Sequence, residues 1–386
     1  MHRPGLEIER LTPQNSSELL FEDVPFLESM QTEHDEFSAV IKNMTDAKVY
    51  RLRQLLLDVV RHDVHKRAIL EDALSVTGHA DICDDIIACY STAQIVTMLI
   101  AGVRFHELQK KLPALKESSG DYIINPSPNM YFMRDPAAVT QHGVISSNMK
   151  FSGRQFESRL LKLIFKHHPD FRDDYHEVYP GNDMAHIPTI EGGDVMVISP
   201  FVLAVGCSER TASAAIEKVA GNILAGGQVE RVYEVKLPSQ RNYMHLDTVF
   251  SVVDENLVVT YPDAINSLLE TYVYRINRID DENKFSLHKE AIKQSLISIL
   301  KNEIPHLDVI ETGYGHPEHS SREQWYDGAN VFAIGPRRVI SYDRNKHTNR
   351  ALRDMGVEVI EIRSSELSRG LGGPRCMTMP IERDDI

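Results

Sequence analysis

Hydrophobic positions between residues 51 and 112 follow a helical period. Ile95, Leu99 and Val103 recur every four residues, and Pro113 closes the stretch. Such a period is typical of amphipathic helices, which bury one face. The pattern predicts a small helical bundle at residues 51–118, inserted into a different kind of fold and used for packing or for an oligomer surface.

The rest of the chain alternates short apolar runs, turns and helical segments. One series places strands at 195–198 and 201–205, a helix at 211–219 and a strand near Val232. The same order returns at 331–334, 339–342, 348–355 and 357–360, and a further hairpin is predicted at 250–253 and 257–261. A ββαβ unit used several times indicates an α/β repeat architecture.

Charged residues repeat at a fixed interval along these units. Asp135, Glu191 and Asp247 follow one another at intervals of 56 residues. Arg154 lies 19 residues after Asp135, and Arg210 lies 19 residues after Glu191. If the units are arranged around an axis, equivalent positions point to a common centre, and we expect these side chains to meet there.

The composition limits the classes of partner. The 386 residues include 42 Lys and Arg against 56 Asp and Glu, and this net charge of −14 argues against nucleic acid or anionic lipid. No apolar run approaches the roughly 20 residues that span a bilayer, and the first residues lack the apolar core of a secretory signal. Four scattered cysteines without a CxxC pair favour neither a disulfide scaffold nor a structural zinc site. We therefore expect a cytoplasmic protein.

Cys376 has the most reactive setting of the four cysteines. It follows Gly370, Gly372, Gly373 and Arg375. Glycines let the backbone approach or cover a ligand, and a neighbouring cation lowers the pKa of a thiol. Cys376 is therefore a candidate nucleophile, although an inert buried cysteine on a glycine-rich loop fits the same local sequence. A packing role is expected for the other cysteines, Cys83, Cys89 and Cys207.

His245 and Asp247 are candidates for acid–base chemistry. They alternate at the start of a predicted strand, which places them on one face. A histidine beside a carboxylate suits proton transfer near neutral pH, but the same pair could bind a metal or be an ordinary surface pair. Glu191 at a Gly-Gly turn and Asp135 in a turned loop are weaker candidates by themselves, since solvated turns have the same composition.

Together, these residues indicate a planar cationic substrate. Carboxylates hold a guanidinium group in paired hydrogen bonds, and its carbon is open to attack by a thiolate once a departing nitrogen can be protonated. The two repeated arginines could bind a substrate carboxylate. No metal site is expected at the remaining histidine pairs, which lack carboxylates at ligand spacing: His167, His168, His316 and His319.

Six sequence strings carry a resemblance to a known family. In order, they are NMYFMRDP, IEGGDV, GCSERT, MHLDTVF, DGANVFAIGPRRVISYDRN and GGPRCMTMP. With the opening HRPGLEIERLTP, they resemble bacterial-type arginine deiminase from residue 2 to the C-terminus. The resemblance implies a five-fold pseudosymmetric αβ-propeller at residues 1–50 and 119–386, interrupted by the helical insertion at 51–118. Members of that family usually begin with a further stretch that includes most of a first strand, so either the start of this sequence is assigned too late or the first blade lacks its first strand.

The resemblance further implies hydrolysis of L-arginine to L-citrulline and ammonia through an amidino-cysteine intermediate, without a metal or organic cofactor. Cys376 matches the nucleophile and His245 the general acid and base. Asp135 and Asp247 match the pair that holds the guanidinium, and Glu191 matches the acid that supports this grip.

Further positions match residues that contact the amino-acid end of the substrate or line the pocket: Asn129, Phe132, Arg154, Arg210 and Asn330. Leu371 stands where some members carry an arginine in a mobile loop. Arg369 or Arg375, on either side of Gly370, could replace that arginine in the gating loop.

Other functions remain open from the sequence. They are hydrolysis of another guanidine such as agmatine or a methylated arginine, amidino transfer, non-catalytic arginine binding, and metal-dependent hydrolysis through His245 and Asp247. The expected partners are a small-molecule substrate and further copies of the chain in a homo-oligomer.

Overall fold

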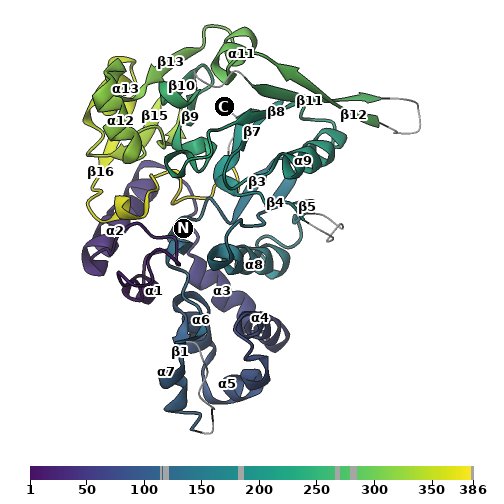
Figure 1. The fold of residues 1–386 in the computed structure, drawn as a ribbon, viewed down its shortest axis with the longest axis vertical. Coiled ribbons are helices and arrows are strands. Elements are labelled where there is room, and N and C mark those ends of the chain that lie inside the picture. Colours follow the sequence, from purple (N-terminus) through teal and green to yellow (C-terminus); the bar gives the residue numbers. More distant parts are fainter. Residues whose placement is uncertain (114, 116–120, 181–186, 266–269, 279–284, 384–386) are drawn as a thin grey trace.

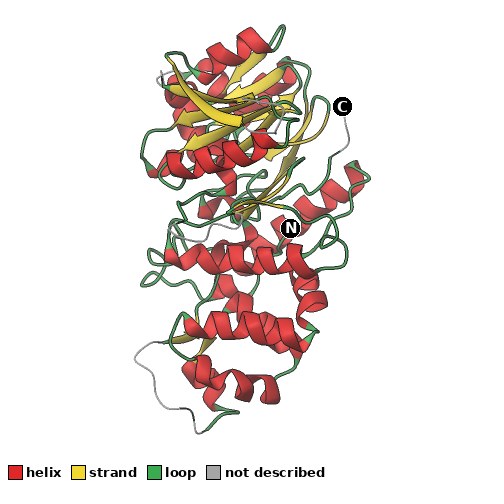
Figure 2. Ribbon diagram, turned by 90° about the vertical axis from the view of Figure 1, so that its right-hand side faces the viewer, coloured by secondary structure: helices red, strands yellow, loops and turns green. Residues whose placement is uncertain are grey.

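The apolar period between residues 51 and 112 corresponds to a bundle of helices. A computed structural model describes residues 1–386 apart from 114, 116–120, 181–186, 266–269, 279–284 and 384–386. The bundle consists of α3 (Leu52–Val60), α4 (Asp63–Ser75), α5 (Cys83–Cys89), α6 (Thr92–Ala101) and α7 (Phe105–Gln109). These helices form the lower part of the molecule in Figures 1 and 2. The predicted end of the insertion, residue 118, lies outside the described residues.

Local sequence signals set the two ends of α6. The Ser91 hydroxyl accepts a hydrogen bond from the Gln94 amide, and the Gln94 side chain accepts one from the Ser91 amide. Gly102 ends the helix with a φ of +72°. Leu99 is fully buried in a hydrophobic core that continues into α8 (Ser152–His167). The bundle is therefore joined to the strand-rich part of the molecule by shared packing.

Outside the bundle, the described residues contain four ββαβ units. The first consists of β3 (Ala137–Thr140), β4 (Gly143–Ser146), α8 and β5 (Glu177–Tyr179). The second consists of β6 (Val195–Ser199), β7 (Val202–Cys207), α9 (Ser213–Ala225) and β8 (Arg231–Lys236). The third contains β9 (Phe250–Asp254), β10 (Leu257–Thr260), α11 (Leu296–Glu303) and β13 (Asp308–Glu311). The fourth consists of β14 (Phe332–Gly335), β15 (Arg338–Tyr342), α13 (Lys346–Asp354) and β16 (Glu358–Ile362).

The four units share one pairing pattern. In each, the second strand pairs antiparallel with the first strand and parallel with the last. The helix that precedes the last strand provides the crossover that a parallel pair requires. The repeated ββαβ order predicted from the sequence is therefore confirmed.

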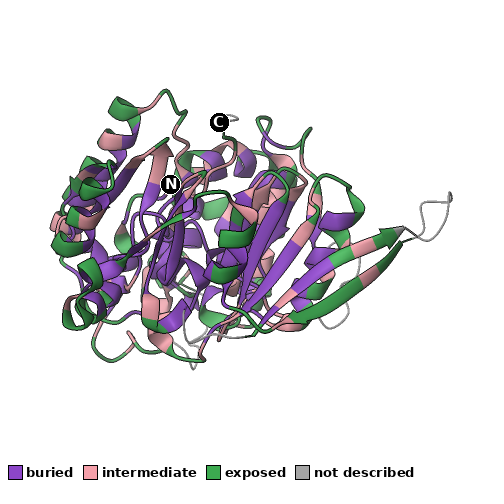
Figure 3. Ribbon diagram, turned by 90° about the horizontal axis from the view of Figure 1, so that it is seen from above, coloured by how far each residue is buried: buried purple, intermediate pink, exposed green. Residues whose placement is uncertain are grey.

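A long hairpin interrupts the third unit. β11 (Thr271–Arg278) and β12 (Phe285–Ile292) pair with each other, and β11 also pairs with β8 of the second unit. The resulting sheet has the order β12-β11-β8-β7-β6. Seen from above in Figure 3, this hairpin projects outward from the buried strands. The insertion makes the third unit longer than the others.

The first 50 residues contain α1 (Leu6–Glu9) and α2 (Leu27–Met44) and no strand. The remaining α-helices and strands of the described residues are β1 (Val103–Arg104), β2 (Tyr122–Ile124), α10 (Pro262–Ile265) and α12 (Pro317–Trp325). Among the described residues, no helix is both long enough and apolar enough to cross a membrane. The fold is of the mixed α/β class, as expected, whereas five-fold pseudosymmetry stays a prediction.

Candidate active site

The acids of the 56-residue series lie just before the first strands of successive units. Asp135 precedes β3, Glu191 precedes β6 and Asp247 precedes β9. His245 joins them, since its Nε2 atom lies 2.8 Å from Glu191 Oε2 and its Nδ1 atom 3.7 Å from Asp135 Oδ1. The Cys376 Sγ atom lies 3.7 Å from Asp247 Oδ2. The structure therefore brings the five residues of the predicted catalytic set together.

A buried acid also occupies the equivalent place in the fourth unit. Asp327 precedes β14, and its Oδ2 atom has no hydrogen-bond partner among the described residues. Burial, with Asp247 and Asp135 nearby, raises the pKa of Asp327 well above its usual value. Asp327 was not predicted from the sequence, because the β11–β12 hairpin breaks the 56-residue interval. Asp327 could have been predicted from its position, because an acid stands ahead of the predicted first strand of each unit.

Backbone hydrogen bonds fix the position of Cys376. Its amide donates to Asn330 Oδ1 at 3.0 Å, and Asn330 Nδ2 donates to the Asp247 carbonyl at 2.9 Å. Gly373 permits this approach, because a Cβ atom there would lie 2.6 Å from Asn330 Oδ1. Asn330, expected at the substrate, is fully buried and links the backbones of Cys376 and Asp247. This geometry favours a positioning role for Asn330.

The groups around Cys376 disfavour its thiolate form. Burial raises the pKa of the Cys376 thiol well above its usual value, and Asp247 and Asp135 add to the increase. Arg375, expected to lower this pKa, has its Nε atom 3.7 Å from Asp247 Oδ2. A cation placed between Asp135 and Asp247 lowers the pKa of the Cys376 thiol, because it offsets the negative charges of the two carboxylates.

His245 and Asp247 do not lie on a strand, so that part of the sequence prediction is wrong. His245 is extended, Leu246–Thr248 forms a 3₁₀ turn, and β9 begins only at Phe250. Asp194 Oδ1 accepts a hydrogen bond from the Leu246 amide at 2.9 Å. The Thr248 hydroxyl donates to the His245 carbonyl at 2.7 Å. These bonds occupy the backbone groups that a strand would need.

Two acids determine the charge of His245. Burial alone would lower the pKa of His245, but Asp135 and the hydrogen bond with Glu191 outweigh it and raise the pKa to about 9. Burial alone would raise the pKa of Glu191, but the hydrogen bond with His245 and the charges of His245 and Arg210 lower it to about 2. His245 is therefore an imidazolium near neutral pH and holds a proton that it can donate.

The two repeated arginines each pair with the acid of their own unit. Arg154, in the first turn of α8, lies 2.8 Å from Asp135 Oδ2 and 2.9 Å from Glu157 Oε2. Arg210, just before α9, lies 3.5 Å from Glu191 Oε2. The 19-residue spacing thus corresponds to an arginine–carboxylate pair in both units. These arginines orient the acids, a role that was not predicted from the sequence.

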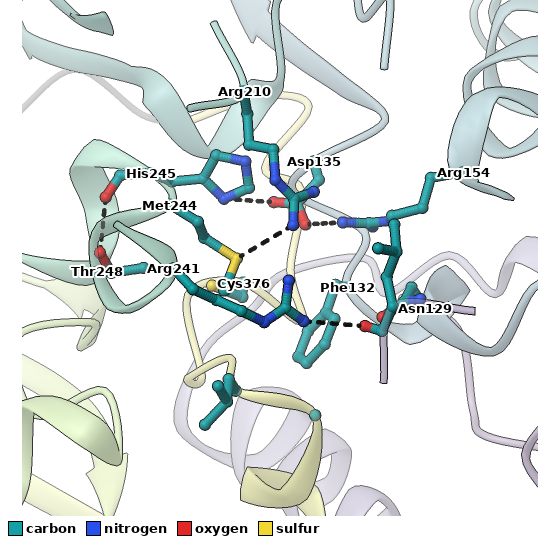
Figure 4. A pocket seen from close by; sticks show the side chains of 13 residues that line it. Asn129, Phe132, Asp135, Arg154, Arg210, Arg241, Met244, His245, Thr248 and Cys376 are labelled. Atoms are coloured by element: carbon teal, nitrogen blue, oxygen red, sulfur yellow. Dashed lines mark hydrogen bonds and ion pairs between the residues drawn. The ribbon is translucent and has the colours of Figure 1, made fainter. Parts of the chain in front are cut away.

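These side chains surround a small pocket (Figure 4). Its cavity measures about 20 Å³, room for about one water molecule. Asn129, Phe132, Asp135, Arg154, Arg210, His245 and Cys376 line it, as predicted, together with Leu20, Arg241, Met244, Thr248, Gly370 and Leu371. The last six were missed as pocket residues, although Gly370 and Leu371 were placed in the gating loop. Among the described residues, no cluster of His, Cys, Asp and Glu is arranged to hold a metal ion.

A comparison with known families identifies the chain. The family model described as arginine deiminase matches residues 17–383. The chain belongs to the arginine deiminase family.

Curated relatives in the arginine deiminase family match over the whole chain. The arginine deiminase of Oenococcus oeni is 38% identical, with 100% of this chain and 94% of that protein covered. Those of Latilactobacillus sakei subsp. sakei and Staphylococcus aureus (strain JH9) are 37% and 36% identical, each with 100% of this chain and 95% of the relative covered.

A solved structure overlaps with the chain more loosely. It is the product-bound N-terminal domain of ArgZ, a cyanobacterial arginine dihydrolase. The TM-score is 0.47 and the sequence identity 16%, with 75% of this chain and 88% of that one covered.

The gating loop of this arginine deiminase family member differs from the expectation. Arg369 pairs with Asp23 and with Glu366 at 2.9 Å, and Arg375 is buried beside Asp247. Leu371 lines the pocket with a φ of +56°, in the left-handed region. The pocket-facing positions of this loop are therefore Gly370 and Leu371.

The cysteines differ in one respect from expectation. Cys83 is buried and Cys207 is half-buried, which suits packing, but Cys89 is exposed, so a packing role for Cys89 is wrong.

Substitution of Gly193 by alanine is expected to lower kcat by about 100-fold, because displacing a catalytic group by about 1 Å has an effect of this size. A Cβ atom at Gly193 would lie 2.6 Å from His245 Nδ1 and 3.0 Å from Asp135 Oδ1. Citrulline formation by Gly193→Ala and by the control Gly221→Ala checks this. Gly221 lies in α9, where a Cβ atom has ordinary contacts. Equal activity of both variants would show that the His245–Asp135 geometry is not critical.

Proposed function

We propose that the chain hydrolyses L-arginine to L-citrulline and ammonia through a covalent amidino-cysteine intermediate. One observation carries the proposal. Asp135 Oδ1 and Asp247 Oδ1 are buried and have no hydrogen-bond donor among the described residues. Carboxylate oxygens in this state, beside a thiol and an imidazolium, favour a planar cation with several N–H donors, and a guanidinium group is such a cation.

In the proposed complex, the guanidinium lies between Asp135 and Asp247, with its carbon next to the Cys376 sulfur. The cation offsets the two carboxylates that raise the pKa of the Cys376 thiol. The thiol then loses its proton to water and becomes the nucleophile. Arg154 holds Asp135 in place, and Arg210 holds Glu191. The Nε atom of Arg210 is buried and has no hydrogen-bond partner among the described residues, so it is available to the amino-acid end of the substrate.

The first half-reaction releases ammonia. The Cys376 thiolate attacks the guanidinium carbon, and a carbon–sulfur bond forms. One terminal carbon–nitrogen bond then breaks as His245 gives its proton to the departing nitrogen, which leaves as ammonia. Cys376 now carries a cationic amidino group and His245 is neutral.

The second half-reaction releases citrulline. Neutral His245 takes a proton from a water molecule, whose oxygen attacks the same carbon. The carbon–sulfur bond breaks as the new hydroxyl group loses its proton, which restores the Cys376 thiol and leaves a carbonyl in citrulline. His245 is again an imidazolium, so the site returns to its starting charge.

Substrate entry requires a change in the pocket wall. A cavity of about 20 Å³ is smaller than an arginine molecule. We assign this opening to the gating loop, with Gly370 and Leu371 moving away from the pocket and Arg369 holding the start of the loop through Asp23. Asn129 and Phe132 also line the pocket, and the Phe132 ring lies against this loop, since a Cβ atom at Gly370 would be 3.1 Å from it.

The proposal includes an architecture. It consists of a five-bladed propeller built from residues 1–50 and 119–386, with the helices of residues 51–118 as an insertion. The four ββαβ units and the location of the acids before their first strands support it. We further propose that the enzyme works in the cytoplasm as a homo-oligomer.

The test is citrulline formation from L-arginine by the purified chain. We expect citrulline and ammonia in equal amounts, unaffected by a chelator. A folded protein that forms no citrulline would contradict the proposal, and binding of arginine without turnover would favour a non-catalytic homologue. Agmatine and methylated arginines tested in parallel separate arginine deiminase activity from hydrolysis of other guanidines.

A further inference from the structure

The gating loop rests on aromatic rings through its backbone. A Cβ atom at Gly370 would lie 2.2 Å from the Tyr131 hydroxyl oxygen, and one at Gly372 would lie 2.1 Å from the Phe132 ring. Glycine backbone therefore touches the rings directly, with no space for a side chain between them. Because glycine has no side chain to bury, this contact stabilises the closed loop only weakly, and the closed position depends on hydrogen bonds.

Two buried tyrosines donate such hydrogen bonds, one on each side of the pocket-facing positions. The Tyr131 hydroxyl donates to the Leu367 carbonyl at 3.2 Å. The Tyr342 hydroxyl, at the end of β15, donates to the Gly372 carbonyl at 2.8 Å. The Leu367 side has a second support, since the Glu33 carboxylate accepts a hydrogen bond from the Leu367 amide at 2.9 Å. Among the described residues, no further side chain bonds to the Gly372 backbone, so this end of the loop depends on Tyr342.

A strained residue opposes the bond at Gly372. Leu371, the preceding residue, has a φ of +56° and a ψ of +69°, in the left-handed region. A residue with a Cβ atom is unfavourable in this region, and leucine has no polar group that could form a compensating local hydrogen bond. The closed loop therefore contains backbone strain that opening can release. A single hydrogen bond can then shift the balance between the closed and the open loop.

The arginines of this loop do not provide the closing contact, because Arg369 and Arg375 pair with acids and do not line the pocket. We propose that Tyr342 is a positioning residue that holds the gating loop closed over the substrate through Gly372, against the strain at Leu371. Opening breaks this hydrogen bond and releases the strain. The closed loop keeps bulk water away from the covalent intermediate. The inference rests on the proposed function, since it names the residue that controls access to the same pocket.

Alkylation of Cys376 by iodoacetamide tests this inference without turnover. The Cys376 thiol is 4% exposed in a small pocket, so the reagent reaches it only while the loop is open, and the rate follows the open fraction. Tyr342→Phe keeps the ring and removes the hydroxyl. We expect alkylation to become about 3- to 10-fold faster, the range for one hydrogen bond between uncharged groups, with the same pH midpoint because no charge changes. The exposed Cys89, followed by peptide mass, should react at one rate in every variant.

Two further variants separate this role from a general loss of stability. Asparagine enters the left-handed region more readily than leucine at similar size, so Leu371→Asn is expected to favour the closed loop and to slow alkylation of Cys376 by about 2- to 10-fold. Tyr274→Phe is the matched control, because Tyr274 is equally buried and its hydroxyl donates to Glu234 at 2.5 Å outside the pocket lining. This variant is expected to change alkylation less than about twofold, even where it lowers the melting temperature.

Exchange of labelled arginine in the Cys376→Ala background gives a second readout. In Tyr342→Phe, the free and the arginine-bound closed states lose the same hydrogen bond, so the dissociation constant is expected to stay within about twofold. The association and dissociation rates are expected to rise together, by the factor seen in alkylation. A general disturbance of the pocket would instead change the dissociation constant, and that result would contradict the inference.

Three alkylation results would also overturn the inference: an unchanged rate in Tyr342→Phe, an equal increase in Tyr274→Phe, or a faster reaction in Leu371→Asn. If one of these appears in a chain that forms citrulline, the inference fails and the proposed function stands. If the expected alkylation pattern appears in a folded chain that forms no citrulline, the proposed function fails and the assignment of Tyr342 stands.

Discussion

Replacement of Cys376 by alanine is expected to reduce citrulline formation by at least about 10⁴-fold, as for the loss of the nucleophile in enzymes with a covalent mechanism. The thiol lies 3.7 Å from Asp247 Oδ2 in the pocket that we assign to the guanidinium. Removal of its sulfur leaves the carboxylates and His245 in place, so arginine still binds but has no covalent path. The measurements are kcat for citrulline and the mass of acid-quenched protein during turnover. Wild type gains the mass of arginine less ammonia, because the amidino group on Cys376 still carries the rest of the amino acid, and Cys376→Ala gains nothing.

Cys207→Ala is the matched control. Cys207 ends β7 outside the pocket lining, and burial raises the pKa of its thiol to about 11, so it is a poor nucleophile near neutral pH. We expect this variant to keep wild-type activity within about twofold. Residual activity of Cys376→Ala at the level of Cys207→Ala would exclude the covalent mechanism.

Replacement of Asp247 by asparagine is expected to lower kcat/KM by about 10³-fold, since removal of one electrostatic contact to the reacting group has effects near this size. The change preserves the shape of the side chain and the backbone carbonyl that Asn330 binds. It removes one of the two charges that hold the guanidinium. It also removes a charge that raises the pKa of the Cys376 thiol, so this pKa falls.

Asp247→Asn therefore has two opposite expected effects. Catalysis falls, whereas alkylation of Cys376 by iodoacetamide near neutral pH becomes faster, because a larger fraction of the thiol is ionised. The rate of mass increase at Cys376 measures the second effect. Asp173→Asn, at an exposed acid that pairs with its neighbour Arg172 outside the pocket lining, is the control for both measurements. Slower alkylation together with lost activity would point to a general disturbance of the pocket.

The sequence predicted those features that depend on local pattern and on repeats. Strand and helix order follows from apolar periodicity, and the interval of 56 residues brought out Asp135, Glu191 and Asp247. The interval did not predict Asp327, because the inserted hairpin lengthens one unit without changing its ββαβ order. The family resemblance placed Asn330 at the substrate, whereas the structure shows its side chain bonded to the backbones of Cys376 and Asp247.

Other features depended on tertiary contacts within and between units and could not be predicted from a local pattern. The turn at Leu246–Thr248 exists because Asp194, from the preceding unit, takes the Leu246 amide. The pairing of Arg154 with Asp135 likewise requires that the helix and the strand of one unit lie in their final positions. Alternation along a short segment carries no information about such partners, and it led to the wrong strand around His245.

Because the reactive groups come from three successive units and the C-terminal segment, chemistry and complete folding are coupled. The acids precede the first strands of successive units, and the nucleophile enters on the C-terminal segment through its bond to Asn330. An intermediate in which any one unit is undocked contains every reactive side chain but no assembled centre. In refolding, catalytic activity thus reports on the final docking of the units, while secondary structure reports on each unit alone.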